Sequence, residues 1–191
     1  MTEQAPRSGP TLTRYREYLL LLARIQIDPG MRAKVDPSDI VQDALLKAHK
    51  AFDQFQGKTE QQLASWLRTI LANTLANAFR ALGRRQGDGE RSLEATLEES
   101  SVRLEKLLSD GRLSPEQIAA RNEQLLRLAE ALLQLPEDQR QVLELKHLRG
   151  CSVAEICEQT GRSKSSVVGL LFRGMKKLRV LIGDSTKGAG R

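Results

Sequence analysis

The sequence predicts an all-α protein built from two small helical domains, and three observations lead to that prediction. Aromatic residues make up 4% of the 191 residues, which is low for the core of a β-sandwich or barrel. Residues of high helix propensity, such as Ala, Leu, Glu, Gln, Lys and Arg, dominate the composition. Apolar residues recur at helical spacing in both halves of the chain, on either side of a stretch of different composition.

The chain is basic, with a formal net charge of +6 and a pI near 9.6, which favours nucleic acid or an acidic membrane surface as a partner. Its two cysteines, Cys151 and Cys157, are too few for a disulfide framework and lack zinc-finger spacing. The apolar run at 19–23 is too short for a signal peptide or a membrane span. We therefore expect a reduced, cytoplasmic protein that binds no metal and no membrane.

Three helices are expected in the first half of the chain. The start of the second is the clearest, because Asp36 is a good N-cap and Pro37 suits the first helical position. Its apolar positions Ile40, Val41, Ala44, Leu45, Ala48 and Phe52 recur at helical spacing. The predicted helices span about 11–27, 36–53 and 60–82 and form a domain at 11–86, after a disordered lead at 1–10.

Composition changes after this domain, where Glu, Ser and Gly become frequent. We predict a flexible acidic linker with partial helix at 87–113. Ser114, Pro115 and Gln117 then form the signature of a capping box that begins a second domain. Its predicted helices span about 114–134, 135–148, 153–159 and 164–181, within a domain at 114–182 that is followed by a disordered tail at 183–191.

Residues 152–179 have the pattern of a helix-turn-helix. Cys157 supplies the small residue needed where two helices cross closely, and Gly161 suits the left-handed turn between them. Ser163 is placed to cap the second helix. Helical spacing assigns Val167, Leu171, Gly174 and Leu178 to the core side of that helix, and Ser165, Val168, Gly169, Phe172, Arg173 and Lys176 to its outer side.

Positive charge is concentrated on the same segment. No acidic residue interrupts the cations Arg162, Lys164, Arg173, Lys176, Lys177 and Arg179. Such a cluster can neutralise DNA phosphates, although an ordinary solvated basic face would look alike by charge alone. The small residue, the glycine and the helix cap at compatible spacing favour DNA binding.

Two sets of residues resemble those of a known family. Residues 135–140 (LPEDQR) and 152–179 resemble region four of extracytoplasmic-function (ECF) sigma factors, and the N-terminal half resembles region two of the same family. Residues 39–43 (DIVQD) look like its polymerase-binding motif. Residues 64–67 (ASWL), followed by Asn73 and Arg80, look like its minus-ten promoter helix. The resemblance implies a region two helical bundle and a region four helix-turn-helix, which together direct core RNA polymerase to promoters and help to melt them.

The resemblance assigns a polymerase-binding role to three residues off the buried stripe of the second helix, namely Asp39, Gln42 and Asp43. Asp39 can also act as a helix-capping carboxylate, and the two roles are compatible. For Gln42 and Asp43 the alternative is an ordinary solvated surface. The implied contact on the polymerase is the coiled coil of its clamp.

The same resemblance implies contacts to the minus-ten element from Gln56, Lys58, Asn73, Arg80, Arg84 and Arg85. The loop at 56–60 aligns with the loop that captures unstacked bases, which requires a pocket and hydrogen-bond donors. Asn73 could instead be a helix-surface amide. Trp66 is expected to be a packing anchor and not a stacking platform.

Region four resembles the reader of the minus-thirty-five element, and Val168, Gly169, Phe172 and Arg173 align with the family's contact positions. The basic cluster and the outer side of the same helix add Arg162, Lys164, Ser165 and Lys176 as expected contacts. Val168 and Gly169 depart from the polar or basic residues that the family often has at those positions. We therefore expect binding there to depend more on phosphate contacts and DNA shape than on hydrogen bonds to bases.

The implied partners are promoter DNA and core RNA polymerase, through its clamp and its flap, with an anti-sigma protein as an expected inhibitor. No cofactor and no catalytic residue are expected, because His49 and His147 are isolated and no phosphate-binding loop or nucleophile elbow is present. Two alternatives are a stand-alone dimeric helix-turn-helix regulator and an adaptor that binds polymerase but not DNA. Binding to palindromic operators without polymerase would favour the regulator, and salt-insensitive behaviour would favour the adaptor.

Overall fold

The computed structural model describes residues 10–83, 89–109 and 121–188. The chain divides into two compact units, Met1–Glu98 and Glu99–Arg191. Every regular element in the described ranges is helical, which confirms the predicted all-α class. None of the helices described is both long and apolar enough to cross a membrane.

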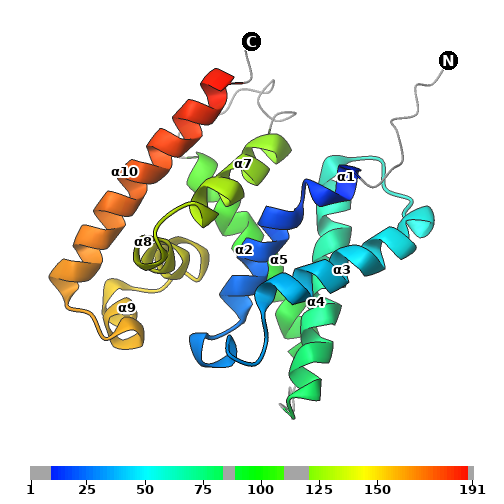
Figure 1. Ribbon diagram of the computed structural model, residues 1–191, viewed down its shortest axis with the longest axis horizontal. Coiled ribbons are helices and arrows are strands. Elements are labelled where there is room, and N and C mark those ends of the chain that lie inside the picture. Colours follow the sequence, from blue (N-terminus) through cyan, green and yellow to red (C-terminus); the bar gives the residue numbers. More distant parts are fainter. Residues whose placement is uncertain (1–9, 84–88, 110–120, 189–191) are drawn as a thin grey trace. The chain divides into compact units, whose positions relative to one another are not determined.

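The first unit is a bundle around α2, α3 and α4. In Figure 1, α3 crosses α4, and both helices pack with α2. The unit buries Tyr18, Leu22, Leu67 and Leu71 completely, and each such side chain contributes roughly 1.5–3 kcal/mol by leaving water. Its elements are α1 (Pro10–Thr13), α2 (Arg16–Gln26), the 3-10 turn η1 (Pro29–Met31), α3 (Pro37–Lys50), the 3-10 turn η2 (Phe52–Gln54), α4 (Glu60–Ala81) and the first half of α5 (Gly89–Ser109).

Both long helices of this bundle begin with side-chain caps. Asp36 accepts a hydrogen bond from the backbone N–H of Ser38 at 2.7 Å, which confirms the predicted N-cap of α3. Thr59 and Gln62 form a reciprocal capping box at the start of α4. The α3 helix ends at Lys50, earlier than predicted, because the chain turns there into η2.

The single helix predicted over 11–27 is divided into α1 and α2. The break lies at Tyr15, which is completely buried. Its hydroxyl donates a hydrogen bond to the carboxylate of Glu60, at the start of α4. Tyr15 thus connects the break to the start of α4, while its backbone keeps right-handed helical dihedral angles.

The segment predicted as a linker with partial helix contains one continuous helix, α5. Leu93, Leu97 and Leu104 on this helix are buried. Within the first unit, Glu94 accepts a hydrogen bond from the Thr69 hydroxyl at 2.6 Å, and Glu98 forms an ion pair with Arg68. Apolar burial and specific acidic contacts thus make this segment more ordered than its hydrophilic composition predicts.

The second unit is built around α10, which packs against α7, α8 and α9. Gly174 permits close contact with α8, since a Cβ there would stand 3.0 Å from Leu143 Cδ1. α10 continues to Gly188, into the predicted tail, whereas the predicted capping box at Ser114 lies outside the described residues. The elements are the second half of α5, α7 (Arg121–Leu133), α8 (Glu137–Leu143), the π-helical turn η3 (Glu144–Leu148), α9 (Val153–Thr160) and α10 (Lys164–Gly188).

Candidate functional site

The second unit contains a helix-turn-helix formed by α9 and α10. Gly161 ends α9 with φ 67° and ψ 17°, the left-handed conformation that the sequence predicts. The Ser163 hydroxyl then accepts a hydrogen bond from the backbone N–H of Ser166 at 3.3 Å, which confirms the predicted cap of α10. The turn is therefore specified by local interactions.

The start of α9 has a capping box that the sequence analysis did not identify. Ser152 N–H donates to the Glu155 carboxylate at 2.7 Å, and Glu155 N–H donates to the Ser152 hydroxyl at 3.2 Å. The hydrogen bond from the Ser152 backbone holds the pKa of the Glu155 carboxyl below its usual value. The Ser-x-x-Glu spacing was the available signal.

A small apolar core holds the two helices together. Ile156 and Val167 are completely buried, and Cys157 packs against the same core from its predicted position at the helix contact. The buried members of this core are Val142, Leu145, Ile156, Val167 and Leu170. Because α9 and α10 both bury their inner sides here, the opposite side of α10 is left for solvent or a partner.

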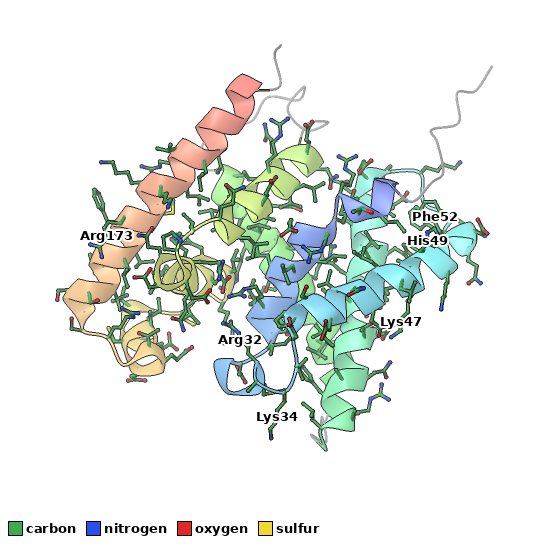
Figure 2. All side chains as sticks on the ribbon, viewed as in Figure 1. Arg32, Lys34, Lys47, His49, Phe52 and Arg173 are labelled. Atoms are coloured by element: carbon green, nitrogen blue, oxygen red, sulfur yellow. The ribbon has the colours of Figure 1, made fainter. Side chains whose placement is uncertain are left out.

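The outer side of α10, which we call the α10 face, consists of Lys164, Ser165, Val168, Gly169, Phe172, Arg173 and Lys176. All of these side chains are exposed except Gly169, which is half-buried. Figure 2 shows Arg173 on the side of α10 that faces away from α8 and α9. Arg162 is half-buried at the entry to the helix. The structure therefore brings the predicted minus-thirty-five residues together on one face.

Arg173 and Gly169 are adjacent on this face. A Cβ added to Gly169 would lie 3.1 Å from Arg173 Nη1, and its three nearest neighbours would all be atoms of that guanidinium group. The absence of a side chain at Gly169 therefore leaves space for the arginine head group. Gly169 has a structural consequence even though it offers no side-chain hydrogen bond of its own.

Asp39, Gln42 and Asp43 are all exposed on α3, at the spacing of one helix side. The Asp43 carboxylate forms an ion pair with Lys47 at 2.8 Å. Lys47 Nζ also donates to the Thr74 hydroxyl of α4 at 3.3 Å, and Figure 2 marks Lys47 on α3. Asp43 is therefore partly neutralised by its own helix, and Lys47 connects this surface to α4.

Leu46 is an exposed apolar residue beside these polar groups, and the sequence analysis missed it. Its exposed fraction is 52%, and it follows Gln42 by one helical turn. We call Asp39, Gln42, Asp43 and Leu46 the α3 surface. The signal in the sequence was that Leu46 falls outside the predicted apolar stripe of this helix.

Asn73 and Arg80 are exposed on α4, as a nucleic-acid contact requires. Asn77, which the sequence analysis missed, is also exposed and lies one turn after Asn73. We call Asn73, Asn77 and Arg80 the α4 face. The remaining predicted arginines, Arg84 and Arg85, lie outside the described residues.

The loop before α4 is held at both ends. Gln56 and Lys58 are exposed, and the backbone N–H of Lys58 donates to Gln62 Oε1 at 2.7 Å. Gly57 lies directly against the Phe55 ring, where a Cβ would clash. That ring packs against Trp66, with a centroid separation of 5.0 Å. Trp66 is half-buried among aromatic rings, which agrees with the packing role expected for it.

A buried cation on α4, Arg68, was not predicted. Arg68 is 8% exposed and donates to the Tyr18 hydroxyl at 3.0 Å and to the Glu98 carboxylate. Burial alone would lower the pKa of Arg68, but interactions with Tyr18 and Glu98 outweigh it and raise the pKa. Arg68 thus stays charged and joins α2, α4 and α5 within the first unit.

In the described ranges, no group of three or more His, Cys, Asp or Glu side chains is arranged to hold a metal ion. Cys151 and Cys157 are both free thiols. The exposed groups described above are the α3 surface, the α4 face and the α10 face, which present polar, basic and apolar side chains.

Two known families match this chain, one within each unit. Residues 14–85 match the family described as Sigma-70 region 2, and residues 125–178 match the one described as Sigma-70, region 4. These ranges contain the α3 surface, the α4 face and the α10 face. The exposed residues therefore lie within the segments that the two families share with this chain.

Two of the relatives that match this chain are RNA polymerase sigma factors. The chain is 30% identical over 144 residues to the ECF RNA polymerase sigma-E factor of Escherichia coli K12, covering 75% of this chain and 72% of the relative. It is 31% identical over 156 residues to the ECF RNA polymerase sigma factor SigG of Mycobacterium tuberculosis H37Rv, covering 76% and 42%. The sigma factor RpoE of Bartonella quintana, solved in complex with the anti-sigma factor NepR, matches at 20% identity and a TM-score of 0.33, covering 91% and 95%.

Proposed function

This chain belongs to the ECF family of RNA polymerase sigma factors and directs core RNA polymerase to promoters, and we propose that its three exposed surfaces divide that work. Its partners are core RNA polymerase and promoter DNA. The observation that carries the function is the presence of regions 2 and 4, in order, on one chain. A stand-alone operator-binding regulator is not proposed, because region 2 would have no role in it.

The α3 surface is the proposed contact to the clamp of the polymerase. An exposed leucine beside carboxylate and amide groups supports this role, because interfaces combine an apolar anchor with a polar rim. Asp39 and Gln42 supply the polar groups, and Leu46 supplies the apolar contact. Lys47 sets the orientation of Asp43 by its ion pair.

The α4 face and the loop at 56–60 are the proposed contacts to the minus-ten element. Amides such as Asn73 and Asn77 can both donate and accept hydrogen bonds, as the edges of unstacked bases require. Arg80 adds a cation for the backbone phosphates. The hydrogen bond from Lys58 to Gln62 and the contact of Gly57 with Phe55 support a loop shaped before DNA binds.

The α10 face is the proposed contact to the minus-thirty-five element in the duplex. Lys164, Arg173 and Lys176 are exposed cations on the second helix of a helix-turn-helix, which is the helix that enters the major groove in such motifs. We propose that the same unit also contacts the flap of the polymerase.

Run-off transcription with purified core polymerase and a promoter library tests the function. We expect specific transcripts only when the chain is added, and identical start sites with and without it would overturn the proposal. Arg173→Ala should weaken binding through the upstream element, whereas Asn73→Ala should impair melting of the downstream element. If Arg173→Ala affected only the downstream element, the assignment of the α10 face would be wrong.

Inhibition by an anti-sigma protein remains a proposal that rests on the family resemblance alone. A tagged full-length chain, expressed in its own host without added core enzyme, should then copurify with a protein that blocks run-off transcription when added back. A chain that is fully active as isolated, and unaffected by any copurifying protein, would contradict it.

A further inference from the structure

Two large apolar side chains lie exposed in the middle of the basic α10 face. Phe172 is 72% exposed and Val168 is 49% exposed. They are one helical turn apart, so they lie side by side along the helix. Lys164, Arg173 and Lys176 surround them with positive charge.

The position of this apolar pair limits what can cover it. The first turns of a recognition helix are the ones that reach base edges in the major groove, and Val168 and Phe172 lie there. Neither side chain can donate or accept a hydrogen bond, so neither can read the polar groups of a base. The apolar group that bases display in the major groove is the C5 methyl of thymine.

We propose that Val168 and Phe172 are specificity-determining residues that contact thymine methyl groups in the minus-thirty-five element. The inference rests on the proposed role of the α10 face and adds a base preference to it. The sequence led us to expect that binding here depends mainly on phosphate contacts and DNA shape. The inference instead assigns to Val168 and Phe172 a direct apolar contact with bases. The surrounding cations bring the DNA close enough for the two side chains to be covered.

A third exposed apolar residue on α10 provides a matched control. Val180 is 55% exposed but lies about 12 Å further along the helix than Phe172, since an α-helix rises by about 1.5 Å per residue. Val180 is therefore beyond the first turns of the helix, which are the part that enters the groove. Val180→Ala therefore removes exposed apolar surface from the same helix without touching the proposed contact.

The experiment uses holoenzyme assembled from core polymerase and the full-length chain. Upstream elements are first selected from a library randomised only in that region. Each thymine of the selected element is then replaced singly by deoxyuridine, which removes the methyl group and leaves the base pairing intact. Equilibrium competition should show about a fourfold loss of affinity at one or more positions, the value expected for exposing one buried methyl.

Variants then locate the effect on the helix. Holoenzyme with Phe172→Ala should bind more weakly and should no longer distinguish thymine from deoxyuridine at those positions. Holoenzyme with Val180→Ala should retain the full difference. If Phe172→Ala kept the wild-type difference at every sensitive position, and Val168→Ala did too, the contact would be made elsewhere and the inference would be wrong.

The remaining outcomes separate this inference from the proposed function. Equal affinity for thymine and deoxyuridine at all positions, or a selected element without thymine on either strand, would refute methyl readout while leaving promoter recognition intact. Failure to select any upstream element would refute the role of the α10 face itself. An upstream element that is selected and is sensitive to methyl removal supports both.

Discussion

The guanidinium group of Arg173 lies over Gly169, one helical turn earlier on α10, at a point where a Cβ would stand 3.1 Å from Nη1. Gly169 is an unfavourable residue in the interior of a helix, because glycine loses more backbone entropy than alanine on folding. Gly169 thus lowers the stability of the helix, but it leaves space for the Arg173 guanidinium group on the α10 face.

Gly169→Ala should therefore increase stability and decrease DNA affinity. The free energy of unfolding should rise by up to about 1 kcal/mol, because alanine has the higher helix propensity and the flexible guanidinium can move aside. Displacement of Arg173 should lower the affinity of holoenzyme for the upstream element by roughly threefold to tenfold. Urea denaturation and promoter competition measure the two effects.

Gly183→Ala is the control for Gly169→Ala. A Cβ at Gly183 would meet nothing within 4 Å, and this residue is also within α10. This variant should gain stability without loss of DNA affinity. Equal DNA affinities for the two variants and wild type would show that Gly169 does not set the position of Arg173.

Arg68→Met should destabilise the first unit. The substitution keeps much of the side-chain volume but removes the hydrogen bonds to Tyr18 and Glu98. Loss of a buried charged donor leaves polar groups of its partners without that contact, which costs about 2–4 kcal/mol. Denaturant unfolding of the full chain, with Trp66 fluorescence reporting on the first unit, measures the change.

Arg80→Met is the matched variant, since Arg80 is an exposed arginine of the same helix. Its unfolding free energy should stay within about 0.5 kcal/mol of wild type. Tyr18→Phe, which removes only the hydroxyl that Arg68 contacts, should fall between the two. Equal stability of Arg68→Met and Arg80→Met would show that the buried cluster does not hold the helices together.

Local signals in the sequence were sufficient for much of the fold. The cap at Asp36, the left-handed Gly161 and the cap at Ser163 all depend on neighbours within a few residues. The packing of α5 was not predictable in this way. Its Glu98 pairs with Arg68, which is 30 residues away in the chain, so a glutamate that indicates a solvated linker by composition is an ion-pair partner in the fold.

The candidate site shows the same limit. Helical spacing correctly separated Val167 and Leu178 from the exposed side of α10, and it could also have found Asn77 one turn after Asn73. It also placed Leu45 on the apolar stripe of α3 and Leu46 outside that stripe, but it did not identify Leu46 as part of an exposed functional surface. Packing of α3 in the bundle leaves Leu46 the more exposed. Whether a side chain is covered depends on the neighbouring helix, which periodicity alone does not specify.

The capping box of α9 should make the stability of the helix-turn-helix depend on pH. The pKa of Glu155 is lowered in the folded state, so its contribution is present above the ordinary glutamate pKa and is lost as the pH falls through the folded value. Glu155→Gln keeps the reciprocal geometry, as Gln62 does in the capping box of α4, but does not titrate. Thermal melts from about pH 7 to about pH 3 should show wild type losing an advantage over this variant. A constant difference in Tm would contradict the assignment.

Gln42→Ala should weaken binding to core polymerase while leaving the helix stable. Gln42 is exposed in the middle of α3, where alanine has at least equal helix propensity, so a binding defect cannot arise from unfolding. Loss of one polar contact beside Leu46 should lower the affinity by roughly threefold to tenfold. Gln61→Ala, at an exposed glutamine near the start of α4, is the matched control and should bind like wild type. If both variants bound core polymerase equally well in a fluorescence titration, the α3 surface would not be the contact.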